Sequence, residues 1–237
     1  EEIEEYIDIS VSISKVYSQR GNDGWLEFEL AGEALLRKRA NILKHATHKI
    51  GKVREIIQAM PLKSYLLVYA AEGEGPVTEV RQDDQLLELL RDEGLTAYEY
   101  DGGTPAQARE YLERQLDDGG IDALVAMRCL DQGVDIPEAR AALFVASTTN
   151  QRQYIQRRGR ILRKPKRPNS DKDHADLYDF IVVPPAPEPE RFELERKLVG
   201  NEVRRARTLA RSAENHLQAL NVLSPLLERY GLLDQEL

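Results

Sequence analysis

The apolar positions of the chain follow two different periods, and these periods predict its elements. Between residues 61 and 185, short apolar runs alternate with stretches whose apolar residues recur at helical spacing. The short runs are typical of buried strands and the longer stretches of amphipathic helices. The predicted strands are 64–70, 96–101, 122–127, 141–146 and 176–183, and the predicted helices are 79–94, 105–116 and 151–162.

Strands that alternate with helices in this way predict an α/β fold. They are expected to form an open parallel sheet that is covered by helices on both faces. Ligands of such sheets bind beyond the carboxyl ends of the strands. A functional site is therefore expected where the predicted strands end.

The residues before this region predict other elements. The alternation over 8–17 is typical of a strand, 19–24 is typical of a turn, and 25–30 predicts a second short extended segment. A helix is predicted over 33–60, and Pro61 follows its end. Its apolar residues at roughly helical spacing are Leu35, Ile42, Ile50, Val53 and Ile57.

The Pro-rich stretch 184–190 predicts a stiff linker, and two or three helices are predicted after it. We therefore expect three parts. These are a lead-in segment with a helix over 1–60, an α/β domain over 61–185 and a helical extension over 186–237.

Composition narrows the classes of protein that fit. The chain of 237 residues is 41% hydrophobic, which argues against bulk disorder, and its single cysteine excludes a disulfide framework. No apolar run is long enough to span a bilayer. A net charge of −8 argues against coating nucleic acid by overall charge, but residues 152–167 contain eight Lys or Arg and no acidic residue.

A phosphate-binding P-loop is missing from the sequence. Such a loop requires GxxxxGK[ST], and the one Gly-Lys pair, Gly51-Lys52, is followed by Val53 within a predicted helix. Asp92-Glu93 is similar to the start of an acidic Mg²⁺-binding box but follows a helical pattern, so we interpret it as a solvated helix end. The chain alone is expected to lack the groups that bind Mg²⁺ and nucleoside triphosphate.

Other candidate sites are weaker. His45 and His48 lie three apart on a predicted helix, but no further ligand is grouped with them, so a metal is not expected. Cys129 is interpreted as a small buried hydrophobe. The Gly-Gly pairs at 102–103 and 119–120 lack GxGxxG spacing, which argues against a dinucleotide-binding enzyme.

The basic stretch 152–167 is a better candidate site, because its residues suit phosphate binding. On a helix Gln156, Arg160 and Arg163 fall at i, i+4 and i+7, which is one face, and Gly159 permits close approach to the backbone. Two guanidiniums at the rim of an α/β sheet suit a polyphosphate or nucleic acid, because their forked donors match phosphate oxygens. The alternative is a solvated basic helix.

The basic residues that follow have two interpretations of equal weight. Lys164, Lys166 and Arg167 could extend a nucleic-acid surface, which would make binding sensitive to salt. They could equally belong to a solvated loop before the last strand, since 164–176 is rich in loop-forming residues.

Two stretches resemble the motifs of a known family. LVAMRCLDQGVDIP (124–137) resembles motif V of superfamily-2 helicases, and QRRGRILR (156–163) resembles motif VI. YLLVYA stands where motif IV stands, and YDGGTPAQAR resembles the strand, turn and helix that follow it. The resemblance covers about 33–183 and matches the second RecA-like lobe of these enzymes. The form of motifs V and VI is most similar to the XPB-like and restriction-subunit-like helicases.

The resemblance implies roles for individual residues. Arg160 and Arg163 would be arginine fingers that stabilise charge on the transferred γ-phosphoryl group. Residues implied to line the ATP cleft are Gly133, Asp135 and Gln156. Residues implied to lie toward the nucleic-acid backbone are Gly102, Gly103 and Arg128.

The resemblance also accounts for the missing P-loop. In this family the P-loop and the acidic box belong to a first lobe, which would bind most of the ATP and Mg²⁺. The chain is then expected to be the second lobe of a longer protein, or to pair with another chain, with 1–60 leading to the first lobe. We expect a DNA helicase or translocase inside the cell, in the cytoplasm, nucleoid or nucleus, with no membrane partner. The alternatives are an RNA helicase lobe and a non-catalytic module that binds nucleic acid or a partner.

Overall fold

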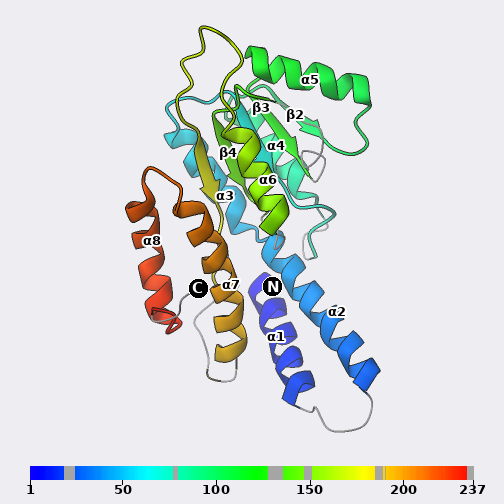
Figure 1. The fold of residues 1–237 in the computed structure, drawn as a ribbon. Coiled ribbons are helices and arrows are strands. Elements are labelled where there is room, and N and C mark those ends of the chain that lie inside the picture. The colour runs from blue at the N-terminus through cyan, green and yellow to red at the C-terminus, as the bar shows by residue number, and fades with distance from the viewer. Residues whose placement is uncertain are drawn as a thin grey trace. The chain divides into compact units, whose positions relative to one another are not determined.

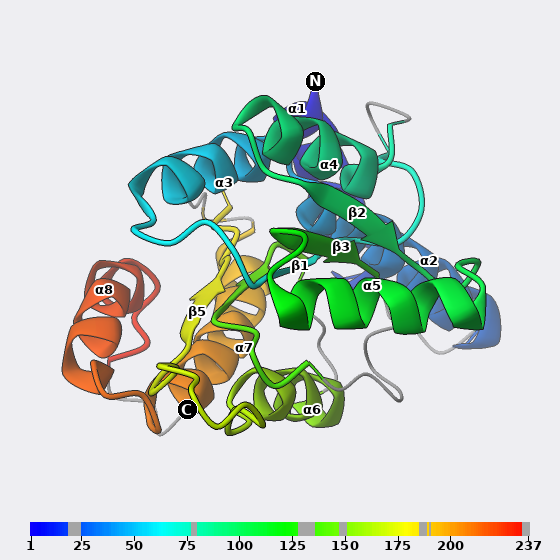
Figure 2. The ribbon, with the colours of Figure 1, turned by 90° about the horizontal axis from the view of Figure 1, so that it is seen from above.

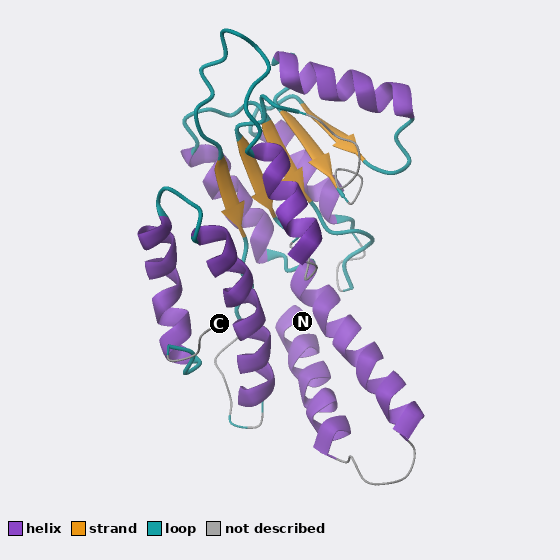
Figure 3. Cartoon of the chain, viewed as in Figure 1, coloured by secondary structure: helices purple, strands orange, loops and turns teal. Residues whose placement is uncertain are grey.

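The chain folds into two compact units. The computed structural model describes residues 1–18, 25–76, 80–127, 136–146, 151–184, 189 and 191–233 (Figure 1). Lys44–Phe180 form one unit, here called the α/β unit. Glu1–Leu43 and Ile181–Leu237 form the other, here called the helical unit. Among the described residues, strands occur only in the α/β unit (Figure 3).

The α/β unit contains the parallel sheet that the sequence predicts. Within the described residues the sheet has five strands in the order β2-β3-β1-β4-β5, and every neighbouring pair is parallel. The strands are β1 (Leu66–Tyr69), β2 (Ala97–Tyr100), β3 (Ala123–Ala126), β4 (Ala141–Phe144) and β5 (Asp176–Asp179). The helices of this unit are α3 (His48–Ala59), α4 (Gln82–Asp92), α5 (Ala106–Asp118) and α6 (Gln151–Ile161). This is a RecA-like open α/β fold.

Helices cover the sheet on both faces, as expected. α3 and α4 lie over one face, and α5 and α6 lie over the other (Figure 2). Every residue of the three central strands is therefore buried. Burial on both faces explains why these strands appear in the sequence as continuous apolar runs rather than as an alternating pattern.

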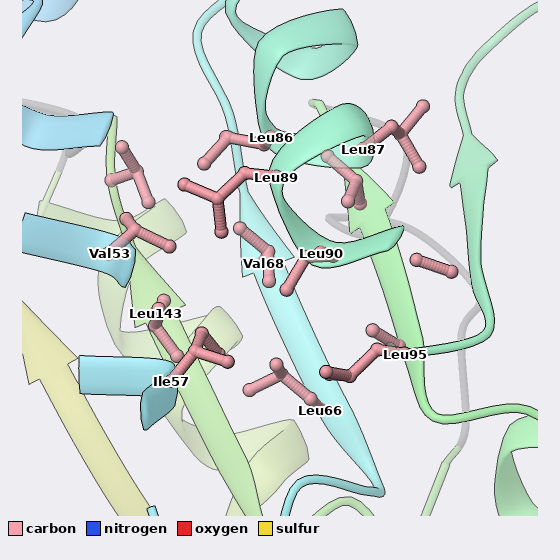
Figure 4. Close-up of a cluster of buried hydrophobic side chains, with 14 of the residues drawn as sticks. Val53, Ile57, Leu66, Val68, Leu86, Leu87, Leu89, Leu90, Leu95 and Leu143 are labelled. Carbon is pink, nitrogen blue, oxygen red and sulfur yellow. The ribbon is translucent and has the colours of Figure 1, made fainter. Parts of the chain in front are cut away.

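The main core lies between the sheet and the helices α3 and α4. In Figure 4, Leu90 of α4 lies beside Val68 of β1, and Val53 and Ile57 of α3 lie beside Leu143 of β4. All five side chains are fully buried. Burial of each such side chain contributes about 1.5–3 kcal/mol relative to an exposed position.

The helix predicted over 33–60 is interrupted, so this prediction is wrong in one respect. α2 (Trp25–Lys44) ends before α3 begins at His48. The Lys44 carbonyl, freed at the end of α2, accepts hydrogen bonds from Gln82 Nε2 at 2.9 Å and from Lys49 Nζ at 3.0 Å. These bonds satisfy the helix end, and the break separates α2 from the helix that packs on the sheet. Pro61 follows the end of α3, as predicted.

Two predictions for the helical unit, a strand and an extended segment, are wrong. Residues 8–17, predicted as a strand, lie in α1 (Glu2–Ser18), and 25–30, predicted as extended, lie in α2. The predicted turn at 19–24 is outside the described residues. The unit also contains α7 (Phe192–Ala210) and α8 (His216–Arg229), in agreement with the predicted C-terminal helices. None of the helices in the described part of the chain is long and apolar enough to cross a membrane.

The start and the end of the chain pack together in the helical unit. Tyr6, Ile9 and Ile13 of α1 form a cluster with Ile42 of α2, and Leu194 of α7 packs against it. The predicted 1–60 segment is thus shared between the two units, since α3 packs on the sheet. The functional division at residues 60 and 185 stays a prediction.

Shortening a core leucine should destabilise the α/β unit. We expect Leu90→Ala to lower the free energy of unfolding by about 2–5 kcal/mol, because it leaves a cavity between α4 and the sheet. Urea unfolding of the chain measures this. Leu62→Ala is the matched control, because Leu62 is 44% exposed and should change stability by less than about 0.5 kcal/mol. Equal effects of the two substitutions would contradict the packing described.

Candidate functional site

Two aromatic rings mark the carboxyl end of the sheet. Tyr69 is the last residue of β1 and Phe144 is the last residue of β4, and their ring centroids are 5.0 Å apart with the planes inclined by 25°. The two strands are direct neighbours in the sheet. The stacked pair therefore forms a flat apolar platform at the edge where α/β proteins bind their ligands.

Arg157 anchors α6 on this platform. Its guanidinium carbon lies 4.9 Å from the Tyr69 ring centroid, and the residue is only 5% exposed. A cation over an aromatic face is attracted by the ring, more strongly when both are shielded from water. Ile161, four residues later on the same face, is fully buried. The face of α6 that carries Arg157 and Ile161 is therefore the one that faces the sheet.

Arg157 is a functional residue that the sequence did not reveal. The sequence pointed to the face of Gln156 and Arg160, and Arg157 stood there only as one member of a run of charged residues. The signal was the pair Arg157 and Ile161 at i and i+4, which marks the anchoring face of a short helix. A buried arginine cannot be distinguished from an exposed one by residue type alone.

The predicted arginine face is present in part. Gln156 is exposed and Arg160 is half-buried, one helical turn apart on α6. Arg163 is exposed and lies beyond Ile161, where α6 ends. Its backbone N–H donates to the Arg160 carbonyl at 3.4 Å, so the chain continues the turn for two more residues. The structure thus brings Gln156 and Arg160 together on the helix and places Arg163 directly after it.

The predicted glycine turn lies at the end of β2. The Thr104 hydroxyl and the Thr104 backbone N–H both donate to Asp101 Oδ1 at 2.8 Å, which closes a tight turn. The hydroxyl bond is the main reason that the pKa of Asp101 is lowered. Gly102 and Gly103 are exposed in this turn, and a Cβ on Gly103 would lie 3.3 Å from Asp101 Oδ2. The turn therefore presents bare backbone at the carboxyl edge.

Helix α5 begins just after this turn. Its N-terminal cap is Pro105, and its first turn contains no acidic residue. The free N–H groups and the dipole at the start of a helix favour a negatively charged group. The glycine turn and the start of α5 thus form a surface suited to a phosphate backbone.

The glycine turn and the arginine helix form two separate patches. β2 and β4 are separated by β3 and β1 in the sheet. With neighbouring strands about 4.8 Å apart, the ends of β2 and β4 are about 14 Å from each other. A single small ligand does not cover both patches, whereas two ligands or one extended ligand can.

Three predicted site residues lie outside the described part of the chain. These are Arg128, Gly133 and Asp135, and Cys129 lies there too. Their roles stay predictions. Among the described residues, no group of three or more His, Cys, Asp or Glu could hold a metal ion. His45 is buried, and burial is the main cause of its lowered pKa.

Arg167 bears on the two interpretations of the basic loop. Its guanidinium forms an ion pair with the Asp118 carboxylate at the end of α5. This contact favours a structural role for Arg167, because it ties the loop to the α/β unit. Lys164 and Lys166 are exposed and leave both interpretations open.

Comparison with known families identifies the α/β unit. Residues 49–165 match the model of the helicase conserved C-terminal domain. The α/β unit belongs to this helicase family. The assignment of motifs IV to VI to the C-terminal lobe of superfamily-2 helicases is thereby confirmed.

One curated protein is similar in sequence to part of the chain. The chain is 30% identical over 136 residues to the DNA 3'-5' translocase XPB2 of Sulfurisphaera tokodaii, which covers 56% of this chain and 28% of that protein. The chain therefore spans little more than a quarter of the length of this curated relative.

Solved DEAD-box structures are also similar to the chain. The yeast splicing factor Prp28 is 16% identical, with a TM-score of 0.49 over 79% of this chain and 35% of that one. A DEAD-box protein from Methanococcus jannaschii is 18% identical, with a TM-score of 0.46 over 66% of this chain and 36% of that one.

The anchor of α6 in the helicase domain can be tested by a double-mutant cycle. Arg157→Met and Tyr69→Leu should each lower the free energy of unfolding, and we expect a coupling between them of about 0.5–2 kcal/mol, because each removes one partner of the cation–π contact. Urea unfolding of the two single variants and the double variant measures this. Tyr69→Phe keeps the ring and should retain the coupling with Arg157. Strictly additive effects would show that the contact contributes nothing.

Proposed function

We propose that the α/β unit is the second motor lobe of an ATP-dependent superfamily-2 DNA helicase or translocase. In this proposal the lobe supplies arginines to a nucleotide bound at a first lobe and forms half of the path for the nucleic acid. The first lobe, in the same or another chain, holds the P-loop, most of the ATP and its Mg²⁺. The chain by itself is then inactive, because no P-loop occurs in its sequence.

The anchoring of α6 is the observation that carries the proposal. Arg157 fixes the helix over the ends of β1 and β4, and Arg160 follows three residues later, on the adjoining part of the helix surface. A half-buried arginine on a fixed helix loses little conformational entropy when it binds phosphate oxygens. Arg160 and Arg163 are proposed to stabilise the charge that develops on the γ-phosphoryl group, and Gln156 to couple that site to the nucleic acid. Gly133 and Asp135 complete the nucleotide cleft in this proposal.

The patch at the end of β2 is proposed to contact the nucleic-acid backbone. Gly102 and Gly103 expose backbone there, and α5 begins beside them with no acidic residue in its first turn. Arg128, after β3, would extend the same surface. Contacts to phosphates position a strand without reading its sequence, which suits a protein that moves along it.

The named function of the relative favours DNA over RNA. The similar protein from Sulfurisphaera tokodaii is a DNA translocase by name. Because the chain covers only 28% of that protein, its activity and substrate are proposed here by likeness alone. An enzyme of this kind acts inside the cell, where its DNA lies.

Removal of the proposed finger should abolish turnover. In the full-length parent enzyme, we expect Arg160→Ala to lower the DNA-stimulated rate of ATP hydrolysis by about 10³–10⁵-fold. Steady-state hydrolysis with duplex DNA, single-stranded DNA and RNA in parallel measures this. Arg54→Ala is the matched control, because Arg54 lies on α3 on the opposite face of the sheet, where its described ion pairs are with Asp92 and Glu93.

The same assay separates the alternatives. Stimulation by RNA alone would replace the DNA assignment with an RNA helicase. No hydrolysis by the parent with any nucleic acid would point to a non-catalytic binding module. Near-normal hydrolysis by the Arg160→Ala enzyme would refute the finger role while leaving the motor assignment in place.

A negative charge in the glycine turn should weaken DNA binding. A Cβ on Gly102 meets no atom within 4 Å and the residue is exposed, so the turn has room for an alanine and lets a longer side chain extend into solvent. We expect Gly102→Asp to raise the Kd of the parent for DNA by about tenfold at low salt, and the effect to shrink as salt screens the charge. Fluorescence anisotropy measures both. Gly102→Ala is the control, and an equal change in the two variants would mean that charge at the turn is irrelevant.

A further inference from the structure

A lysine in the loop before β5 joins two segments that are far apart in sequence. Lys172 Nζ donates to the Pro137 carbonyl at 2.6 Å, to the Ile161 carbonyl at 2.8 Å and to the Arg163 carbonyl at 3.0 Å. An ammonium has three N–H donors, and here each has an acceptor. Ile161 and Arg163 lie at the C-terminal end of α6, and Pro137 lies in the turn that precedes β4.

The end of α6 needs such a cation. The last carbonyls of a helix have no partner within the helix and carry the negative end of its dipole. Lys172 satisfies two carbonyls in this region with a positive charge. Arg163, which provides one of them, and Arg160, one turn earlier, are the two proposed fingers. The ammonium therefore acts on the backbone that carries both.

The loop that carries Lys172 is itself braced against the turn at Pro137. The Ser170 hydroxyl donates to Glu138 Oε2 at 2.7 Å, and Glu138 is only 2% exposed. Arg140 and Asp171 form an ion pair across the same two segments. These contacts place Lys172 independently of its bonds to α6, so the lysine can hold the helix end rather than be held by it.

We propose that Lys172 is a positioning residue for the arginine fingers, because its ammonium fixes the end of α6 to the turn at Pro137. This inference rests on the proposed function and adds a determinant that lies outside motifs V and VI. Arg157 fixes the middle of α6 on the sheet, and Lys172 fixes its end. Arg160 lies between these two anchors.

The positioning role of Lys172 should depend on pH, because the anchor requires the charged ammonium. Burial is the main cause that lowers its pKa, to about 8. The charged groups that face it are Glu138 and Arg140 from the turn and Asp117 from α5, and the three carbonyls favour the charged form. Loss of the proton removes one donor and the charge. The anchor should therefore weaken as pH rises through about 8 and above.

The first test uses the full-length parent at pH 7. We expect Lys172→Met to lower kcat for DNA-stimulated ATP hydrolysis by about 10- to 100-fold, with KM for ATP changed by less than about threefold, because a misplaced finger acts mainly in the transition state. Lys172→Arg, which keeps the charge and the donors, should restore most of the rate. The matched control is Lys52→Met on α3, whose partner Glu55 is exposed with it. A Lys172→Met enzyme with normal kcat would overturn the proposal.

The pH profile separates positioning from a general loss of stability. The parent should lose kcat as pH rises above about 8, and Lys172→Arg, which stays charged, should remove or shift this alkaline fall. A fall that is unchanged in Lys172→Arg would overturn the proposal. Failure of the proposed function gives a different result, since the unsubstituted parent would then hydrolyse no ATP with any nucleic acid.

A measurement without catalysis checks the anchor itself. The N–H groups of Leu162 and Arg163 donate to the carbonyls of Arg158 and Arg160 at 3.1 and 3.4 Å. Amide hydrogen exchange of the 237-residue chain should become faster at these two residues in Lys172→Met, with no change in α3. Unchanged exchange would show that Lys172 does not hold the end of α6 and would overturn the inference even in an active enzyme.

Discussion

The contact between the Arg157 guanidinium and the Tyr69 ring decides where α6 lies on the sheet. Tyr69 stacks on Phe144, so the cation sits on a surface made by the ends of two neighbouring strands. A residue that is 5% exposed and charged is costly to desolvate unless a partner compensates. The aromatic pair favours one position of α6. Because the neighbouring arginines lie on the same helix, this contact also sets where they lie.

A helix of eleven residues is short enough for its ends to fray. α6 has an anchor near its middle at Arg157 and a second at its end, where Lys172 binds the Ile161 and Arg163 carbonyls. The two anchors are different interactions. One is a buried cation on an aromatic ring, and the other is an ammonium at the negative end of a helix. Because they act on different turns, neither can compensate for loss of the other, and the orientation of Arg160 depends on both.

The sequence was sufficient for the sheet because strands such as β1, β3 and β4 are buried on both faces and must be apolar throughout. It was insufficient for α1, where Ile9 and Ile13 fit both an alternating and a helical pattern, and burial against α2 and α7 decides for the helix. The arginines of α6 could be located in the sequence, but the buried one could not be told from the exposed ones, because the ring that Arg157 contacts belongs to Tyr69, far earlier in the chain, and no local pattern encodes this contact. The role of Lys172 could not be predicted from the sequence either, because its acceptors are backbone carbonyls, which any residue provides.

The helical unit shows that local sequence patterns do not reveal which distant segments pack together. α1 and α2 precede the α/β unit in sequence and α7 and α8 follow it, yet they share one compact unit. Arg191 and Glu195, both buried, form an ion pair at 3.2 Å at the start of α7, and the charges of both act on the buried Tyr6 of α1. Such a pair is costly to bury and is tolerated only where its surroundings are well ordered. The segments on either side of the helicase domain therefore pack against each other within one unit, although they are far apart in sequence.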